Sequence, residues 1–304
     1  MASDPTYVPD TERRGLIGLA PPSIRPWLLL ARFDRPIGAW LLFWPGAWAI
    51  ALAGGAVRRW DMLLWFGLGS IAMRAAGCVY NDIIDRDLDA RVARTRDRPL
   101  ASGRIGLKGA WIYLIGLCLI GLVVLFQLNL RAQVVAVASL GLVAAYPYMK
   151  QITWWPQAWL GLVFSWAAVV GWPAVTGGFA WPLSALYGGA VLWVIGYDTI
   201  YALQDIEDDA LAGVRSSARA LGRHARSGVA SLYAGSVALL GLAIWLARPD
   251  PLALIALAPF ALHLGWQVAT LDLADTADAL AKFRSNRFAG LLMFLACFVA
   301  AAGL

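Results

Sequence analysis

Long apolar stretches recur along the chain, and short polar segments separate them. Each stretch approaches the roughly 20 residues that an α-helix needs to cross the hydrocarbon core of a bilayer. The stretches are continuous and lack the in-out alternation of a membrane β-barrel, so helices are favoured over strands. Nine spans are predicted, at residues 37–52, 62–80, 109–128, 132–148, 156–175, 182–201, 227–246, 252–269 and 288–304. The pattern therefore predicts an all-α membrane protein with about nine transmembrane helices.

Composition agrees with a protein embedded in a bilayer. Hydrophobic residues make up 60% of the chain and charged residues only 14%, whereas soluble domains carry about 25% charged residues. The net charge of +6 does not indicate a nucleic-acid surface, because the cations lie in the gaps between apolar spans. The three cysteines lie in apolar segments without metal-ligand spacing, so we interpret them as packing residues.

The distribution of cations predicts how the chain is oriented. Twenty Lys and Arg residues fall in one alternate set of gaps and four in the other, which fits the positive-inside rule with a cytoplasmic N-terminus. The first 27 residues carry acidic side chains before any apolar run, unlike a cleavable signal peptide. We therefore expect a flexible cytoplasmic arm at 1–27 and one transmembrane domain at 28–304. The expected location is the inner membrane of a bacterium.

An acidic segment at the cytoplasmic end of the second span is the most informative part of the sequence. On a helix, Asn81, Asp85 and Asp89 follow one another at intervals of four residues and form one stripe. Carboxylates stacked in this way repel each other unless a cation lies among them. A hard divalent ion fits best, because Mg2+ binds through one or two carboxylates together with substrate phosphate oxygens.

A second acidic segment closes the sixth span on the same predicted side. Asp205 and Asp209 repeat the four-residue spacing, and Tyr197 and Tyr201 extend the stripe into the membrane. Two such clusters facing one cavity would hold Mg2+ ions against one diphosphate. The alternative is that both are solvated helix ends with mixed charge, as cytoplasmic loops often are.

Arg74 is the one cation inside a predicted span, where an unpaired charge costs at least a few kcal/mol. It must therefore face a partner or a wet cavity. A structural ion pair is one interpretation, and contact with a diphosphate or an anionic acceptor is the other. The two histidines, His224 and His263, are interpreted as structural, since no His and Cys cluster suits zinc.

Together these motifs resemble the UbiA-type intramembrane aromatic prenyltransferases, and within them the 4-hydroxybenzoate branch. The resemblance runs from about Arg32 to the C-terminus and includes the acidic spacings of Asn81, Asp85 and Asp89 and of Asp205 and Asp209. The other matching segments are 32–38 (RFDRPIG), 73–78 (MRAAGC), 96–100 (RDRPL), 146–150 (YPYMK), 155–157 (WPQ) and 197–202 (YDTIYA).

The resemblance implies a nine-helix bundle around a central cavity open to lipid, and prenyl transfer from polyprenyl diphosphate to an aromatic acid in ubiquinone synthesis. It implies that Asn81, Asp85, Asp89, Asp205 and Asp209 bind Mg2+, with Asn81, Asp85 and Asp205 central to catalysis. Lys150 would cap the diphosphate. The lipid bilayer is the other expected partner, and neither a nucleic acid nor an obligate protein partner is expected.

One departure from the 4-hydroxybenzoate branch concerns the acceptor. The Lys of the YPYMK segment is usually followed by Arg in that branch, whereas Gln151 follows here. If that Arg binds the acceptor carboxylate, this chain must use another cation, such as Arg74, or accept another aromatic. Homogentisate, a dihydroxynaphthoate, haem and a chlorophyllide are the alternatives.

The expected chemistry produces an allylic cation that must be kept from water. Aromatic faces would line its pocket and stabilise it by cation–π contact, and the candidates are Tyr146, Trp166, Tyr197 and Tyr201. Each of these residues is also an ordinary packing residue of a helical bundle. The alternative from another class is a transporter, but its acidic residues should lie near the middle of the membrane rather than at span ends.

Overall fold

The computed structural model describes residues 16–91, 95–206 and 213–302, and its regular structure within these ranges is entirely helical. Eight of the helices in the described part of the chain are long and apolar enough to cross a membrane. A shorter apolar helix, α3 (Ile37–Leu52), coincides with the first predicted span. The prediction of an all-α membrane protein is confirmed, and each predicted span overlaps a helix of the described residues.

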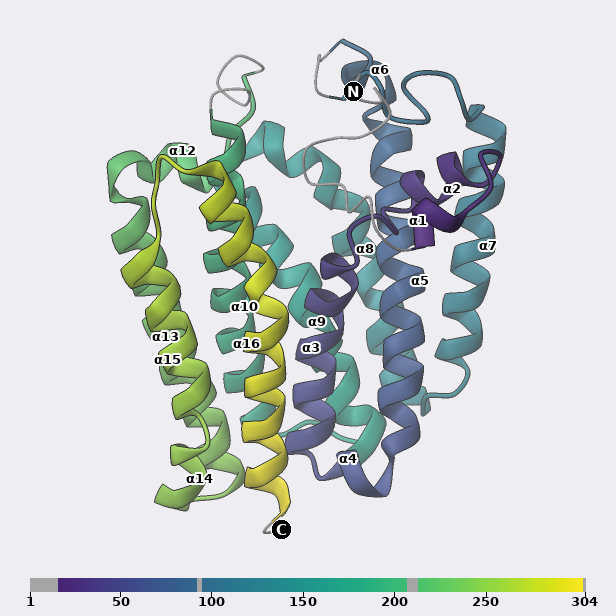
Figure 1. The fold of residues 1–304 in the computed structure, drawn as a ribbon. Coiled ribbons are helices and arrows are strands. Elements are labelled where there is room, and N and C mark those ends of the chain that lie inside the picture. Colours follow the sequence, from purple (N-terminus) through teal and green to yellow (C-terminus); the bar gives the residue numbers. More distant parts are fainter. Residues whose placement is uncertain (1–15, 92–94, 207–212, 303–304) are drawn as a thin grey trace. The chain divides into compact units, whose positions relative to one another are not determined.

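The chain divides into two compact units, and the first comprises residues 1–39 and 68–125. Its long helices are the later part of α5 (Trp60–Ile84) and α7 (Leu107–Leu125), which lie side by side (Figure 1). Gly121 of α7 lies so close to Met73 of α5 that an added Cβ would be 2.5 Å from its sulfur. The short helices of this unit are α1 (Leu16–Leu19), α2 (Arg25–Leu30) and α6 (Arg86–Asp89).

A compact apolar core holds the first unit together. Leu30 of α2 and Val79 of α5 are fully buried in it, and Leu100 joins them from the segment that follows the acidic motif. Trp27 packs edge-on against Tyr113 of α7, with 5.4 Å between ring centroids. Residues 16–27, which the sequence assigns to a flexible arm, thus contribute two helical segments to this unit, and residues 1–15 lie outside the described part.

The second unit comprises residues 40–67 and 126–304 and contains the remaining long helices. The helices of this unit beyond α3 and the start of α5 are α4 (Gly55–Arg58), α8 (Leu130–Ile152), α9 (Pro156–Thr176), α10 (Trp181–Ala202), η1 (Leu203–Asp205), α12 (Ser217–Leu221), η2 (Gly222–His224), α13 (Ala225–Ala247), α14 (Pro251–Ile255), α15 (Ala258–Thr270) and α16 (Thr276–Ala302). Figure 1 shows α10, α13, α15 and α16 grouped together, and α10 packs against α9, α13 and α16.

Small residues and one buried polar network fasten the helices of the second unit. Gly196 of α10 makes room for the ring of Tyr233 from α13, because a Cβ added at this position would overlap that ring. The Tyr233 hydroxyl donates to Gln267 of α15, and Trp193 of α10 donates to Asn286 of α16, both at 2.9 Å. These buried polar groups satisfy one another and thereby link four helices.

Most spans differ from their predicted limits by a few residues, and two differ more substantially. The last helix begins at Thr276, well before the predicted start at residue 288. Lys282 explains the difference, because its ammonium group bonds Asp278 one turn earlier at 2.6 Å and lies 4.8 Å from the Trp266 ring centroid. A paired charge of this kind fits inside a helix, whereas the sequence pattern indicated a loop. The predicted span 252–269 corresponds to two helices, α14 and α15, which are separated by a turn at Ala256 and Leu257. Together they form one segment, Pro251–Thr270, that is long enough to cross a membrane.

Candidate active site

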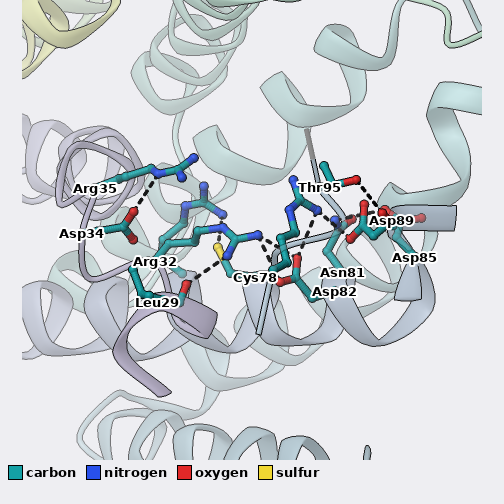
Figure 2. Close-up of polar contacts among 12 residues, drawn as sticks. Leu29, Arg32, Asp34, Arg35, Cys78, Asn81, Asp82, Asp85, Asp89 and Thr95 are labelled. Carbon is teal, nitrogen blue, oxygen red and sulfur yellow. Dashed lines mark hydrogen bonds and ion pairs between the residues drawn. The ribbon is translucent and has the colours of Figure 1, made fainter. Parts of the chain in front are cut away.

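The first acidic segment keeps helical spacing across a break in the helix. Helix α5 ends at Ile84, Asp85 is a turn residue, and α6 begins at Arg86. The backbone N–H of Asp85 still donates to the carbonyl of Asn81 at 2.9 Å, and that of Asp89 donates to Asp85 at 2.8 Å. The Asn81 amide donates to the Asp85 carboxylate at 3.1 Å (Figure 2). The predicted neighbours Asn81 and Asp85 are therefore in direct contact.

Three carboxylates of this segment are buried. Asp82 is 2% exposed, Asp85 5% and Asp89 7%, whereas Asp87 between them is exposed. Burial of carboxylates is costly unless cations or hydrogen-bond donors compensate it. The segment is therefore not the fully solvated helix end that the sequence left open as an alternative.

Two arginines compensate the buried charge. Arg32 contacts both carboxylate oxygens of Asp82, at 2.8 and 3.0 Å, and Arg98 contacts Asp89 at 2.7 Å and Asp82 at 3.4 Å. Burial raises the pKa of Asp89, and the nearby Arg98 opposes that rise. Burial disfavours the charged form of Arg32, but its neighbours Asp82, Cys78 and Asp34, with Asp82 contributing most, together outweigh this effect and raise the pKa of the guanidinium.

The spacing of residues in the sequence assigns no role to Arg32, Asp82 or Arg98. Arg32 is 50 residues from Asp82, so helical periodicity carries no information about their contact. The sequence nevertheless contains a signal for both arginines. Arg32 is the first residue of the segment 32–38 and Arg98 lies in the segment 96–100, and both segments resemble the family.

Arg74 lies in α5 near the start of α3. Its Nη1 donates to the Cys78 sulfur at 2.8 Å, and an added Cβ at Gly38 would lie 2.5 Å from its Nε. Glycine at position 38 thus makes room for the guanidinium. The structure thus places Arg74 beside the Cys78 thiol and Gly38 of the same unit. Its role in substrate binding stays a prediction.

The second acidic segment lies at the end of α10. The helix tightens into η1, which ends at the half-buried Asp205, while Asp209 lies outside the described residues. Behind this segment, the hydroxyls of Thr199 and Ser217 are 2.7 Å apart, and Gln157 accepts the backbone N–H of Ser217 at 2.9 Å. Ser217, the first residue of α12, is thereby bonded to α10 and to the start of α9.

The predicted aromatic wall residues have different surroundings. Tyr197 is 1% exposed and packs against Trp193 and Phe283, with centroid separations of 4.9 and 5.8 Å. Tyr201 lies 4.4 Å from the same Phe283 ring, and Trp166 donates its indole N–H to the carbonyl of Val135. The ring contacts of Tyr197 and Tyr201 and the hydrogen bond of Trp166 all lie within the second unit.

Two further predicted substrate-binding residues come from α8. Tyr146 is half-buried near the end of the helix, and Lys150 belongs to the last turns. The side chain of Lys150 lies outside the described part, so its predicted contact with a diphosphate stays a prediction.

Comparison with known proteins identifies the family. The model of the UbiA prenyltransferase family matches residues 42–299. The chain belongs to this family. It is 42% identical over 289 residues to the mitochondrial 4-hydroxybenzoate polyprenyltransferase of Caenorhabditis elegans, covering 92% of this chain and 79% of that protein. It is 42% identical to the protein of the same name from Bos taurus, covering 92% and 76%.

Solved structures of UbiA homologs have the same fold. The homolog from Aeropyrum pernix superimposes with a TM-score of 0.72 at 24% identity, over 86% of this chain and 97% of that one. A homolog from Archaeoglobus fulgidus, in a structure bound to GPP and Mg2+, has a TM-score of 0.65 at 18% identity, over 91% and 99%. At these identities the likeness concerns the fold.

The donor atoms of this UbiA family member suit a hard cation. Among the described residues, no group of three or more His, Cys, Asp or Glu side chains is placed to hold a metal by itself. Mg2+ does not need one, because it retains water and takes substrate phosphate oxygens beside one or two carboxylates. The amide nitrogen of Asn81 donates to a carboxylate oxygen of Asp85, which places the amide and carboxylate groups side by side, and Asp89 lies one turn further along the chain. This oxygen set therefore fits Mg2+ together with a phosphate-bearing substrate.

Proposed function

We propose that this protein transfers a polyprenyl group from polyprenyl diphosphate to 4-hydroxybenzoate, ortho to the hydroxyl, in ubiquinone synthesis. The observation that carries the proposal is the 42% identity, across 92% of the chain, to proteins named 4-hydroxybenzoate polyprenyltransferase. The acidic segment supports it, because Asn81 and Asp85 lie in contact, and amide and carboxylate oxygens suit Mg2+ that also binds a phosphate-bearing substrate.

Asn81, Asp85 and Asp89 are the proposed ligands in the first unit. Asn81 donates to Asp85, which orients the carboxylate and leaves the amide oxygen of Asn81 to face a cation. Asp205 and Asp209 enter the proposal as further ligands because of their sequence spacing. Lys150 is proposed to contact the diphosphate, since a cation there would offset charge on the leaving group.

In the proposed reaction, the bond between C1 of the prenyl chain and the diphosphate oxygen breaks, and the diphosphate keeps the electron pair. Bound Mg2+ would supply neutralising charge to that leaving group. A carbon–carbon bond then forms between C1 and the ring carbon ortho to the hydroxyl. The ring proton passes to a base, for which a carboxylate of the second acidic segment, a water or the released diphosphate would each serve, and aromaticity is restored. The chain contributes by positioning the diphosphate and by excluding water, which would otherwise yield free polyprenol.

The proposed location is the inner membrane of a bacterium, with the N-terminus and the acidic segments on the cytoplasmic side. The excess of Lys and Arg in one set of gaps supports this orientation. The relatives named above are mitochondrial proteins. A bacterial inner membrane and a mitochondrial membrane place the same demand on such an enzyme, because in both the prenyl chain of the donor lies in the bilayer.

Purified protein in lipid or detergent, incubated with Mg2+ and a labelled polyprenyl diphosphate, tests the proposed function. With 4-hydroxybenzoate we expect a prenylated product and one diphosphate released per product, and chelation of Mg2+ should stop both. The assay is repeated with each of the alternative acceptors, which are homogentisate, a dihydroxynaphthoate, haem and a chlorophyllide. Preferential prenylation of one of these would replace the acceptor in the proposal, and failure to prenylate any acceptor would contradict it.

Arg74 is proposed to bind the acceptor carboxylate, because Gln151 stands where the 4-hydroxybenzoate branch usually has Arg. Substituting Arg74→Gln should raise the KM for 4-hydroxybenzoate by about tenfold or more, since a hydrogen bond between charged groups is lost. The KM for the prenyl diphosphate should stay within about twofold of wild type, which corresponds to less than 0.5 kcal/mol. Steady-state kinetics with each substrate varied in turn measures both values.

The control for Arg74 is Arg86→Gln, which removes an exposed arginine from α6 of the same unit. It should leave both KM values unchanged. An unchanged KM for 4-hydroxybenzoate in the Arg74 variant would show that the acceptor carboxylate binds elsewhere. An equal rise of both KM values would assign Arg74 to the diphosphate instead.

A further inference from the structure

Arg32 has a strained backbone conformation. Its φ angle is 59°, in the left-handed region, and it is the single non-glycine residue with positive φ in the described ranges. The residue closes α2, where its backbone N–H and its Nη1 both donate to the carbonyl of Leu29, at 3.1 and 2.9 Å. Glycine or asparagine would adopt this conformation more readily. An arginine at this position therefore indicates that its side chain is used.

The side chain of Arg32 reaches the acidic segment through Asp82. Both oxygens of Asp82 accept hydrogen bonds from Nη2 of Arg32, and the carboxylate is almost completely buried (Figure 2). Asp82 follows Asn81 directly, so its side chain leaves the helix about 100° away from the face of Asn81 and Asp85. Asp82 thus faces arginine rather than the oxygen set that suits a metal.

Arg98 connects Asp82 to Asp89. Its Nη1 contacts one oxygen of each carboxylate, at 3.4 and 2.7 Å. The turn that carries Arg98 is fastened at two further points. The Thr95 hydroxyl donates to the backbone carbonyl of Asp89 at 2.9 Å, and Leu100 is buried in the core of the first unit. A displacement of Asp82 would therefore be transmitted to Asp89.

We infer that Arg32, Asp82 and Arg98 form a positioning clamp for the acidic segment, in which Asp82 is an ion-pair partner and not a metal ligand. Arg32 fixes Asp82 against the end of α2, and Arg98 carries this constraint to Asp89. The clamp sets the distance and orientation of Asp89 relative to Asp85 across the helix break. The kinetic consequences of this inference rest on the proposed function, whereas the clamp itself can be tested by hydrogen exchange of the backbone.

A double-mutant cycle tests the clamp. The variants are Asp82→Asn, Arg32→Gln and the two combined, with Asp87→Asn and Arg86→Gln as exposed controls from the same segment. Each clamp variant should raise the half-saturating Mg2+ concentration and the KM for prenyl diphosphate by about tenfold, as is usual for partners that orient metal ligands. The double variant should be no worse than the poorer single variant, because both changes remove one interaction.

Other outcomes would overturn the clamp. If the effects of Asp82→Asn and Arg32→Gln multiply, Asp82 acts independently of Arg32, as a metal ligand would. If the clamp variants lower only kcat, with Mg2+ half-saturation and both KM values unchanged, the ion pair serves stability alone. Arg32→Lys provides a milder variant where Arg32→Gln does not fold, since lysine keeps the charge but loses the paired donors of the guanidinium.

Hydrogen exchange separates failure of the clamp from failure of the proposed function. In wild-type protein, the backbone N–H of Arg98 donates to Thr95 and that of Ile105 donates to Pro99, so both should be protected. Asp82→Asn should accelerate exchange of these two amides by at least about tenfold, whereas Asp87→Asn should not. Unchanged exchange would overturn the clamp whether or not the protein transfers prenyl groups, and absent transfer with accelerated exchange would overturn only the function.

Discussion

Substituting Asp85→Ala is expected to abolish prenyl transfer, with kcat/KM at least about a thousandfold below wild type, or about 4 kcal/mol of lost transition-state stabilisation. Asp85 is buried, lies at the break between α5 and α6, and accepts a hydrogen bond from Asn81. Its carboxylate is therefore held in place within the proposed ligand set. The measurement is product formation from labelled prenyl diphosphate and 4-hydroxybenzoate at saturating Mg2+.

Asp87→Ala is the matched control for Asp85. Asp87 lies two residues away but is exposed, so its loss should leave activity and thermal stability near wild type. Asp85→Asn is the second variant, because it keeps the size of the side chain and removes the charge. Near-wild-type activity in folded Asp85→Ala would contradict the metal-diphosphate hypothesis for this segment.

The helices could be predicted from the sequence because a bilayer leaves few choices for an apolar stretch of sufficient length. The predicted span 156–175 differs from α9 by one residue at its end. The start of α16 was missed because Lys282 and Asp278 pair with each other along the helix, and a charge count cannot distinguish a paired ion from a solvated one. The break at Asp85 was missed because the spacing of side chains is the same with and without it.

The site was predictable only where its contacts are local. Asn81 and Asp85 are four residues apart, and their contact follows from helix geometry. The contact between Arg32 and Asp82 depends on how α2 packs against α5 through Leu30 and Val79, which no spacing rule contains. Burial could not be predicted from the sequence for the same reason. Asp82 and Asp87 belong to the same acidic segment, but Asp82 is buried and Asp87 is exposed.

The aromatic candidates illustrate a further limit. Tyr197 and Tyr201 follow the same stripe as Asp205 in the sequence, and both pack against Phe283 of α16 in the second unit. Their stripe alone does not reveal this neighbour, which is about 80 residues away in a chain where helix packing brings distant segments together. Packing against one shared ring is the role that the structure gives them, and contact with a prenyl chain stays a prediction.

The second acidic segment carries the last prediction. Asp205 ends η1 after α10, directly beyond a helix that is anchored by Thr199 to Ser217 and through Ser217 to Gln157. This anchoring makes the backbone around Asp205 well supported without help from its carboxylate. A change of Asp205 should therefore affect ligand binding more than folding, and we expect Asp205→Ala to lower kcat/KM by at least about a hundredfold.

Three measurements decide whether Asp205 acts as a ligand. The thermal unfolding midpoint of Asp205→Ala in detergent should match wild type within about 3 °C, which corresponds to roughly 1 kcal/mol for a chain of this size. Its half-saturating Mg2+ concentration should rise, and Asp205→Glu should recover part of the activity because it restores an oxygen ligand. Asp272→Ala, which removes an exposed carboxylate from the same unit, should behave like wild type. Wild-type Mg2+ dependence in Asp205→Ala would remove the second segment from the metal site and leave the first to bind the diphosphate alone.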